Sequence, residues 1–166
     1  MGPDALSLIP PYLHVIARPT EDRLPHAWPL PTLPAGAVAR RVRANKMRNV
    51  VRLFDELAAA FQFPPYFGEH WAALEECLAD LDWISAGAYL TIVWDAEQLL
   101  PDASCDDMTT FMRVLQRVAA GWSRPVSQGE AWDRPAVPFH VFFVVPENHV
   151  ARFSAKLESL GMEIVK

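Results

Sequence analysis

The sequence predicts an α/β fold built on a small, largely parallel β-sheet of about three to four strands flanked by helices. Residues 88–94 and 139–145 are nearly continuous apolar runs with the length of buried strands. Segments with apolar residues at helical spacing lie before and between these runs. Because strands that alternate with helices form parallel sheets, we expect a three-layer-type α/β arrangement.

The size and composition of the chain are those of one globular domain. Its 166 residues are 51% hydrophobic and 21% charged, which excludes a disordered chain. No apolar run approaches the roughly 20 residues that span a bilayer, and the N-terminus lacks a signal-peptide pattern. We therefore expect a soluble, cytoplasmic protein that does not bind membranes.

The N-terminal region is expected to form a Pro-rich arm over residues 1–36. It holds eight of the 15 prolines, each of which fixes φ and removes a backbone donor. Only residues 12–17 form a candidate strand there. We expect a central domain over 37–145 and, over 146–166, a C-terminal helix and strand extension packed on the same domain.

The first half of the central domain is expected to contain a strand and two helices. Residues 37–42 are compatible with a strand, and Asn49 predicts the N-cap of a helix that Pro64 and Pro65 terminate. A second helix is expected from about Glu69 to Leu81.

The second half continues the alternation. After the strand at 88–94, a short helical turn is expected over 95–100, followed by a helix over 107–121 whose start carries Asp106 and Asp107. Residues 123–137 contain prolines and a glycine and predict a long loop before the strand at 139–145. A helix over 147–160, a cap at Gly161 and a short strand over 162–165 complete the chain.

Charge is unevenly distributed along the chain. The 60 residues from 53 to 112 contain no Lys or Arg and carry twelve carboxylates, whereas six cations lie between Arg40 and Arg52. Such a field steers a basic partner and repels nucleic acid from the acidic face. Alternatively, the carboxylates form an ordinary solvated surface that the Arg-rich segment partly neutralises.

Motifs for catalysis are missing from the sequence. The glycines are scattered without a phosphate-binding spacing, and no metal, redox or hydrolase motif occurs. His140 lies in an apolar run, where a core histidine is expected more often than a metal ligand. Cys77 has acidic neighbours that raise a thiol pKa, which makes it a poor nucleophile. We expect no enzyme activity, cofactor or metal.

The helix expected over 69–81 carries the strongest local signal. On a helical wheel Glu69, Ala72, Glu76 and Asp80 lie along one stripe, opposite an apolar face. Tyr66, in the preceding loop, is the best candidate for an exposed aromatic residue. An exposed aromatic beside carboxylates is typical of a protein interface.

A resemblance to a known family lies in residues 63–78, which read Phe63-Pro-Pro-Tyr-Phe-Gly-Glu-His-Trp-Ala-Ala-Leu-Glu-Glu-Cys-Leu78. This segment resembles the barstar family of ribonuclease inhibitors, whose motif is Pro-x-Tyr-Tyr/Phe-Gly-Glu-Asn followed by a helix reading Leu-Asp-Ala-Leu-x-Asp-Cys-Leu. The resemblance covers roughly residues 37–145. It implies a three-stranded parallel sheet flanked by helices.

The resemblance also implies a function. In the family, the second helix and the loop before it block the active site of a small basic ribonuclease, and their carboxylates take the place of RNA phosphates. Tyr66 matches the tyrosine that packs on the nuclease, Gly68 a close-approach glycine, and Glu76 the acid that inserts deepest. The implied partner-binding residues are Tyr66, Phe67, Gly68, Glu69, Ala72, Glu75, Glu76 and Asp80.

Departures from the family pattern imply a different cognate nuclease or a different kind of partner. Ala72 stands where the family has a second contacting aspartate, Glu75 replaces a tryptophan, and Glu76 is one methylene longer than aspartate. In addition, Arg117 falls near the position of an acid. We hypothesise that Glu75 and Asp80 supply the charge that Ala72 lacks.

The sequence thus predicts an immunity-type inhibitor that binds a basic ribonuclease or nuclease toxin and makes no direct nucleic-acid contact. The alternative is a structural or regulatory interaction module that keeps the fold without inhibiting a nuclease. The oligomeric state is not indicated by the sequence.

Overall fold

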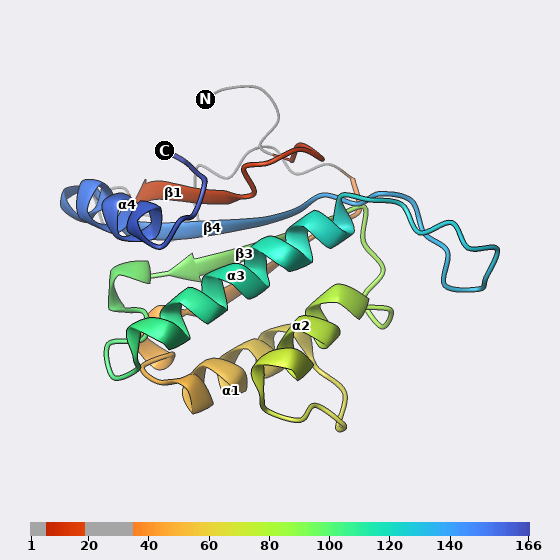
Figure 1. The fold of residues 1–166 in the computed structure, drawn as a ribbon, viewed down its shortest axis with the longest axis horizontal. Helices are drawn as coiled ribbons and strands as arrows, with labels where there is room; N and C mark the ends of the chain where they lie inside the picture. The colour runs from red at the N-terminus through yellow and green to blue at the C-terminus, as the bar shows by residue number, and fades with distance from the viewer. Residues whose placement is uncertain (1–5, 19–34) are drawn as a thin grey trace.

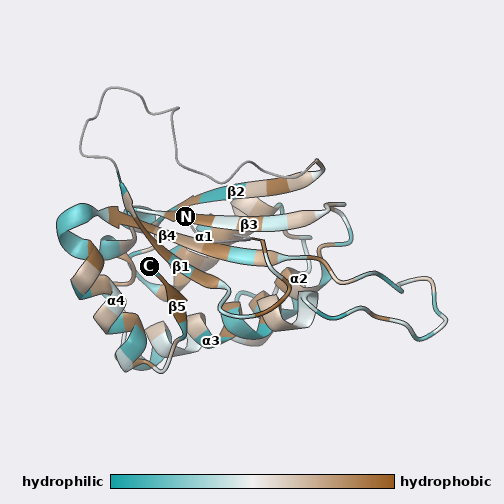
Figure 2. Ribbon diagram, turned by 90° about the horizontal axis from the view of Figure 1, so that it is seen from above, coloured by the Kyte–Doolittle hydropathy of each residue, from teal (hydrophilic) through white to brown (hydrophobic). Residues whose placement is uncertain are grey.

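The computed structural model describes residues 6–18 and 35–166, and its described strands form one five-stranded sheet in the order β2-β3-β4-β1-β5. Every neighbouring pair of strands is parallel, and Figure 2 shows them side by side. The strands are β1 (Leu13–Arg18), β2 (Ala37–Arg43), β3 (Ala88–Trp94), β4 (Phe139–Pro146) and β5 (Ile164–Val165). The helices are α1 (Val50–Phe61), α2 (Trp71–Asp80), α3 (Cys105–Trp122) and α4 (Val150–Ser159), with short 3-10 turns η1 (Ala44–Lys46), η2 (Ala96–Gln98) and η3 (Glu147–His149).

The predicted α/β fold with a parallel sheet is confirmed, and the sheet is slightly wider than expected. The candidate strand at 12–17 forms β1, which pairs with β4 from Leu13 opposite Val141 to Arg18 opposite Pro146. On its other side β1 pairs with the two residues of β5. These two strands extend the sheet of β2, β3 and β4 beyond the three to four strands that the sequence predicted.

Helices α1, α3 and α4 pack on one face of the sheet. On that face Tyr89 of β3 packs against Trp122 of α3 with tilted rings, 4.8 Å between ring centroids, and Phe143 of β4 contacts Phe153 of α4 at 5.6 Å. In Figure 1, α3 runs below the strands, and α1 and α2 lie below α3. The chain moves across the sheet in one direction as it passes from β2 to β3, then to β4 and to β5. Because connections between parallel strands are right-handed, the helices in these connections lie on the same face of the sheet. In the described part of the chain this gives a layer of helices on one face, with α2 packed on α3 rather than directly on the sheet.

The opposite face carries a smaller apolar cluster and two buried histidines. Leu90 and Phe142 pack there against Leu6. The imidazoles of His14 and His140 lie 2.8 Å apart, between Nε2 of His14 and Nδ1 of His140. Since Nε2 of His140 must donate to the carbonyl oxygen of Ser7, at 2.8 Å, its Nδ1 accepts the proton of His14. His140 is 1% exposed and therefore the core histidine that the sequence predicted.

Most helix ends lie where the sequence placed them. The side chain of Asn49 accepts the N–H of Arg52 and caps α1, and Gly161 follows α4 with a φ of +79°. The helix expected from residue 147 begins instead as the 3-10 turn η3 and becomes α-helical at Val150. The expected terminal strand is shortened to Ile164–Val165.

Part of the expected Pro-rich arm, residues 1–5 and 19–34, lies outside the described residues. The division of the chain into an arm, a central domain and an extension therefore stays a prediction, although β1 and α4 contact each other within one fold. None of the helices described is both long enough and apolar enough to cross a membrane.

Candidate protein-binding site

The acidic helix α2 begins two residues later than the sequence predicted. Nδ1 of His70 accepts the backbone N–H of Ala73 at 3.1 Å, so His70 is the N-cap. Glu69 precedes it with a φ of +49°, outside the helix. The expected helix over 69–81 is thus corrected to Trp71–Asp80, and Glu69 does not belong to the helical stripe of Ala72, Glu76 and Asp80.

The loop before α2 is anchored by an aromatic cluster. Phe67 packs edge-to-face against Phe54 and Phe63, with ring centroids 5.8 and 5.0 Å away, and its N–H donates to the carbonyl of Pro64. Phe67 is therefore largely a core residue. Its neighbour Tyr66 is 73% exposed, as expected of a contact residue.

Gly68 has an internal reason to be glycine. A Cβ atom at this position would lie 2.9 Å from Nε2 of His70 and 3.1 Å from Cδ2 of the same ring. That ring cannot move away freely, because its other nitrogen caps α2. Gly68 thus allows the loop to pass close to the N-cap. This reason is independent of the close approach of a partner that the family resemblance implies for this glycine.

Tyr66, Glu76 and Asp80 are brought together around a shallow cavity of about 150 Å³. Ala73 and Cys77, on the buried side of α2, line it with Phe67. Glu69, Ala72 and Glu75, which the sequence also assigned to the site, do not line this cavity. We define the acidic site as Tyr66, Glu76, Asp80 and the adjacent Asp82.

Glu75 is engaged inside the molecule. Its two carboxylate oxygens accept Nε and Nη2 of Arg117 on α3, at 2.8 and 2.6 Å. The pKa of Arg117 is raised, first by this hydrogen bond and then by the negative charge of Glu75. The charge of Glu75 is therefore already compensated, and Asp80 is left for the role that we expected both residues to share.

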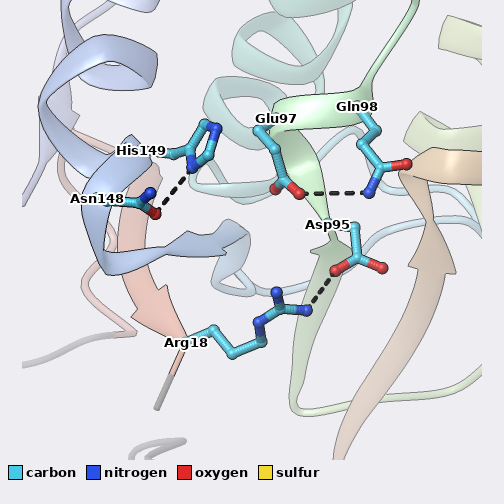
Figure 3. Close-up of polar contacts among 6 residues, drawn as sticks. All are labelled: Arg18, Asp95, Glu97, Gln98, Asn148 and His149. Atoms are coloured by element: carbon cyan, nitrogen blue, oxygen red, sulfur yellow. Dashed lines mark hydrogen bonds and ion pairs between the residues drawn. The ribbon is translucent and has the colours of Figure 1, made fainter. Parts of the chain in front are cut away.

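The Arg-rich segment neutralises carboxylates elsewhere. Arg43 pairs with Glu56 at 2.7 Å, and Arg48 pairs with Asp102 at 2.8 Å. At the carboxyl ends of the strands, Arg18 pairs with Asp95 at 2.7 Å (Figure 3).

By contrast, four carboxylates on and around α2 form no ion pair with any part of the chain that the structure describes: Glu69, Glu76, Asp80 and Asp82. The expected partial neutralisation thus occurs, but among the described residues it leaves these four carboxylates without a cation.

The pKa values at the acidic site reflect burial first and neighbouring negative charge second. Burial, followed by repulsion from Asp82, raises the pKa of Asp80. Burial and the nearby charge of Asp80 raise the pKa of Tyr66. The pKa of the Cys77 thiol is raised by burial and then by Asp80 and Glu76, so this cysteine stays neutral. A cation placed here would offset the repulsion between these negative charges, although not the cost of burial.

The chemistry available at this site is that of binding. Tyr66 offers an exposed aromatic ring, and Glu76 and Asp80 offer acceptor oxygens beside it. Asp82 was not singled out from the sequence as a site residue, although the acidic run that contains it was. Within the described ranges, no three His, Cys, Asp or Glu side chains gather as metal ligands would.

Comparison with known proteins agrees with the geometry. The family model described as barstar, the barnase inhibitor, matches residues 37–144, which is more than half of the chain. No curated protein matches the chain. The matched region contains the acidic site, the strands β2 and β3 and most of β4. This chain belongs to the barstar family.

Proposed function

We propose that this chain inhibits a small basic ribonuclease or nuclease toxin by covering its active site with α2 and the loop before it. Membership of the barstar family suggests a barnase-type inhibitor role. The observation that carries the proposal for this chain is the acidic site, where Glu76 and Asp80 flank an exposed Tyr66 and form no ion pair with the residues that the structure describes.

Inhibition would be electrostatic and steric, with no catalytic step by this chain. The carboxylates of Glu76 and Asp80 would occupy positions that RNA phosphates take in the nuclease. Hydrogen bonds between charged groups are the stronger ones, and they strengthen further where water is excluded. The ring of Tyr66 would supply apolar contact, and the small exposed Ala72 would let the partner approach α2 closely.

The partner is proposed to differ from barnase itself in the surface that faces α3. At this place the chain presents the paired Glu75 and Arg117 rather than a free acid. A partner with a cation opposite Arg117 would be repelled. The cognate nuclease should therefore concentrate its positive charge opposite Glu76 and Asp80.

The test is affinity capture from the source organism with three baits: the natural chain, Glu76→Arg and Glu163→Arg. The last variant makes the same charge change at an exposed residue of the C-terminal region. We expect a small basic protein with ribonuclease activity to bind the natural chain and Glu163→Arg but not Glu76→Arg. Equal retention by all three baits, or no ribonuclease on the natural chain, would count against the proposal.

A further inference from the structure

Residues 123–137, expected as a long loop, form a hairpin that projects beyond the C-terminal end of α3 (Figure 1). Val126 and Arg134 face each other as an antiparallel bridge, with N–H···O distances of 2.9 and 3.0 Å. We call this segment the 123–137 hairpin. It carries Trp132, an exposed aromatic side chain.

The tip of the hairpin is held in one conformation by Asp133. Its carboxylate accepts the backbone N–H groups of Gln128 and Gly129, both at 2.8 Å, and these hydrogen bonds lower its pKa. The N–H of Asp133 donates to the carbonyl of Glu130 at 3.1 Å, and Gly129 takes a φ of +80°. A segment that is ordered before binding loses little conformational entropy when a partner arrives.

The root of the hairpin is tied to the acidic helix. The guanidinium of Arg134 lies 3.9 Å from the ring centroid of Trp122 and donates to the carbonyls of Gly121 and Arg124. In turn, Nε1 of Trp122 donates to the carbonyl of Leu78 in α2 at 2.8 Å. Two contacts thus fix the position of the hairpin relative to α2.

Trp132, near the tip, is 64% exposed. Tryptophan is the residue type most enriched among the side chains that dominate protein interfaces, because it buries a large apolar area. Its neighbour Glu130 is exposed, and residues 127–132 contain no Lys or Arg. The tip therefore suits a partner whose apolar surface is bordered by positive charge.

We propose that the 123–137 hairpin is a second contact with the basic protein that binds the acidic site, and that Trp132 packs into an apolar depression beside its cationic active site. This inference rests on the proposed function and extends it. The acidic site steers and orients the partner, whereas the hairpin slows its dissociation.

Site-specific photocrosslinking tests this proposal in the source organism. The photoreactive residue p-benzoylphenylalanine replaces Tyr66, Trp132 or Val51 in the full chain, one position at a time. Val51 is the control, because it is 61% exposed and lies on α1. We expect the same basic ribonuclease to be crosslinked from positions 66 and 132, and not from position 51.

Two failures are distinguishable. If position 66 captures a basic ribonuclease and position 132 captures nothing or another protein, the hairpin proposal is overturned and the proposed function stands. If position 66 captures no ribonuclease, the proposed function fails, and the hairpin proposal fails with it.

A kinetic measurement with the captured ribonuclease gives a second readout. Trp132→Ala should speed dissociation at least about tenfold, the usual effect of truncating a dominant tryptophan. The association rate and its salt dependence should stay within about twofold, since no charge changes. Val51→Ala should alter neither rate. An unchanged dissociation rate for Trp132→Ala would overturn the proposal.

Discussion

Glu75 and Glu76 are neighbours in α2 with the same side chain, yet their surroundings differ. Both carboxylate oxygens of Glu75 accept from Arg117, whereas Glu76 lines the cavity beside Tyr66. A carboxylate that is already paired gains less from a partner's cation than one that is not. The two residues therefore form a matched pair for testing which charge contacts the partner.

Glu76→Gln should weaken affinity for the captured ribonuclease by about tenfold or more, because it removes a charge-assisted hydrogen bond worth roughly 1.5–3 kcal/mol. Glu75→Gln should weaken affinity several-fold less. Surface plasmon resonance with both variants at one salt concentration makes the comparison. An equal or larger loss for Glu75→Gln would show that the contact lies nearer α3.

The pair His14 and His140 makes stability depend on pH. Burial, and then the proximity of His140, lowers the pKa of His14 to about 4, below the value near 6.5 of an unfolded histidine. Between these values the unfolded chain binds the proton more strongly, so stability is full above about pH 6.5 and falls as the pH drops toward 4. The loss amounts to about 3 kcal/mol for this residue.

Urea unfolding of the natural chain and His14→Gln at pH 7.5, 6 and 4.5 isolates this contribution. Glutamine can still donate to Nδ1 of His140 but takes up no proton. The fall in the free energy of unfolding between pH 7.5 and 4.5 should therefore be smaller in His14→Gln. Parallel pH profiles would show that His14 does not contribute, and that carboxylates such as Glu56 dominate acid unfolding.

At the scale of single elements, α2 depends on an unusual cap. His70 stands where the family motif has asparagine, and its imidazole nitrogen accepts the N–H of Ala73. Any side-chain acceptor at this position serves the exposed N–H groups of the first turn. The cap fixes where α2 begins and hence how Glu76 and Asp80 are presented.

Removing the acceptor should therefore weaken the helix. His70→Ala should lower the free energy of unfolding by about 1 kcal/mol, and His70→Asn should restore it, because asparagine is among the best N-cap residues. Thermal unfolding at neutral pH, followed by circular dichroism, measures both variants. Equal stability of His70→Ala and the natural chain would contradict the role of the cap.

The same helix shows why sequence could predict some elements and not others. β3 and β4 are buried on both faces, so their residues form continuous apolar runs that stand out without a structure. The start of α2 was misplaced because a histidine cap has no strong sequence signature and Glu69 extends the acidic pattern. β5 has only two residues, too few to produce any periodicity.

Residue pairs that join distant elements were also beyond sequence reasoning. The motif identified Tyr66 and Glu76, and the acidic stripe of the helix identified Asp80; the structure brings the three together. The pairing of Glu75 with Arg117, 42 positions apart, follows from the packing of α2 on α3 and not from either helix alone. The tie from Arg134 through Trp122 to Leu78 arises in the same way.

At the scale of the whole molecule, the arrangement of ion pairs determines where on the surface the excess negative charge, −5 in total, is located. Arginines from β1, β2, the segment before α1 and α3 pair with acidic residues, and the carboxylates around the acidic site stay free of such pairs in the part of the chain that the structure covers. An uncompensated patch of this kind attracts a basic protein over about 10 Å at 0.1 M ionic strength.

The association rate with the captured ribonuclease should therefore fall as salt rises, by about tenfold or more between 50 and 500 mM NaCl. Asp80→Asn should lower both the rate at low salt and its salt dependence, because it reduces the charge of the acidic site. Stopped-flow fluorescence measures these rates. A rate that does not change with salt would contradict electrostatic steering.

The central claim is that binding at the acidic site stops RNA cleavage, and the most direct measurement is a titration of ribonuclease activity. The captured ribonuclease is held at a fixed concentration, and the natural chain or Glu76→Arg is added while hydrolysis of a fluorogenic RNA is followed. We predict that activity falls linearly to zero at one equivalent of the natural chain, and that Glu76→Arg requires a large excess. Full activity in a ribonuclease saturated with the natural chain would contradict the claim, and the chain would then be a binding module that does not inhibit.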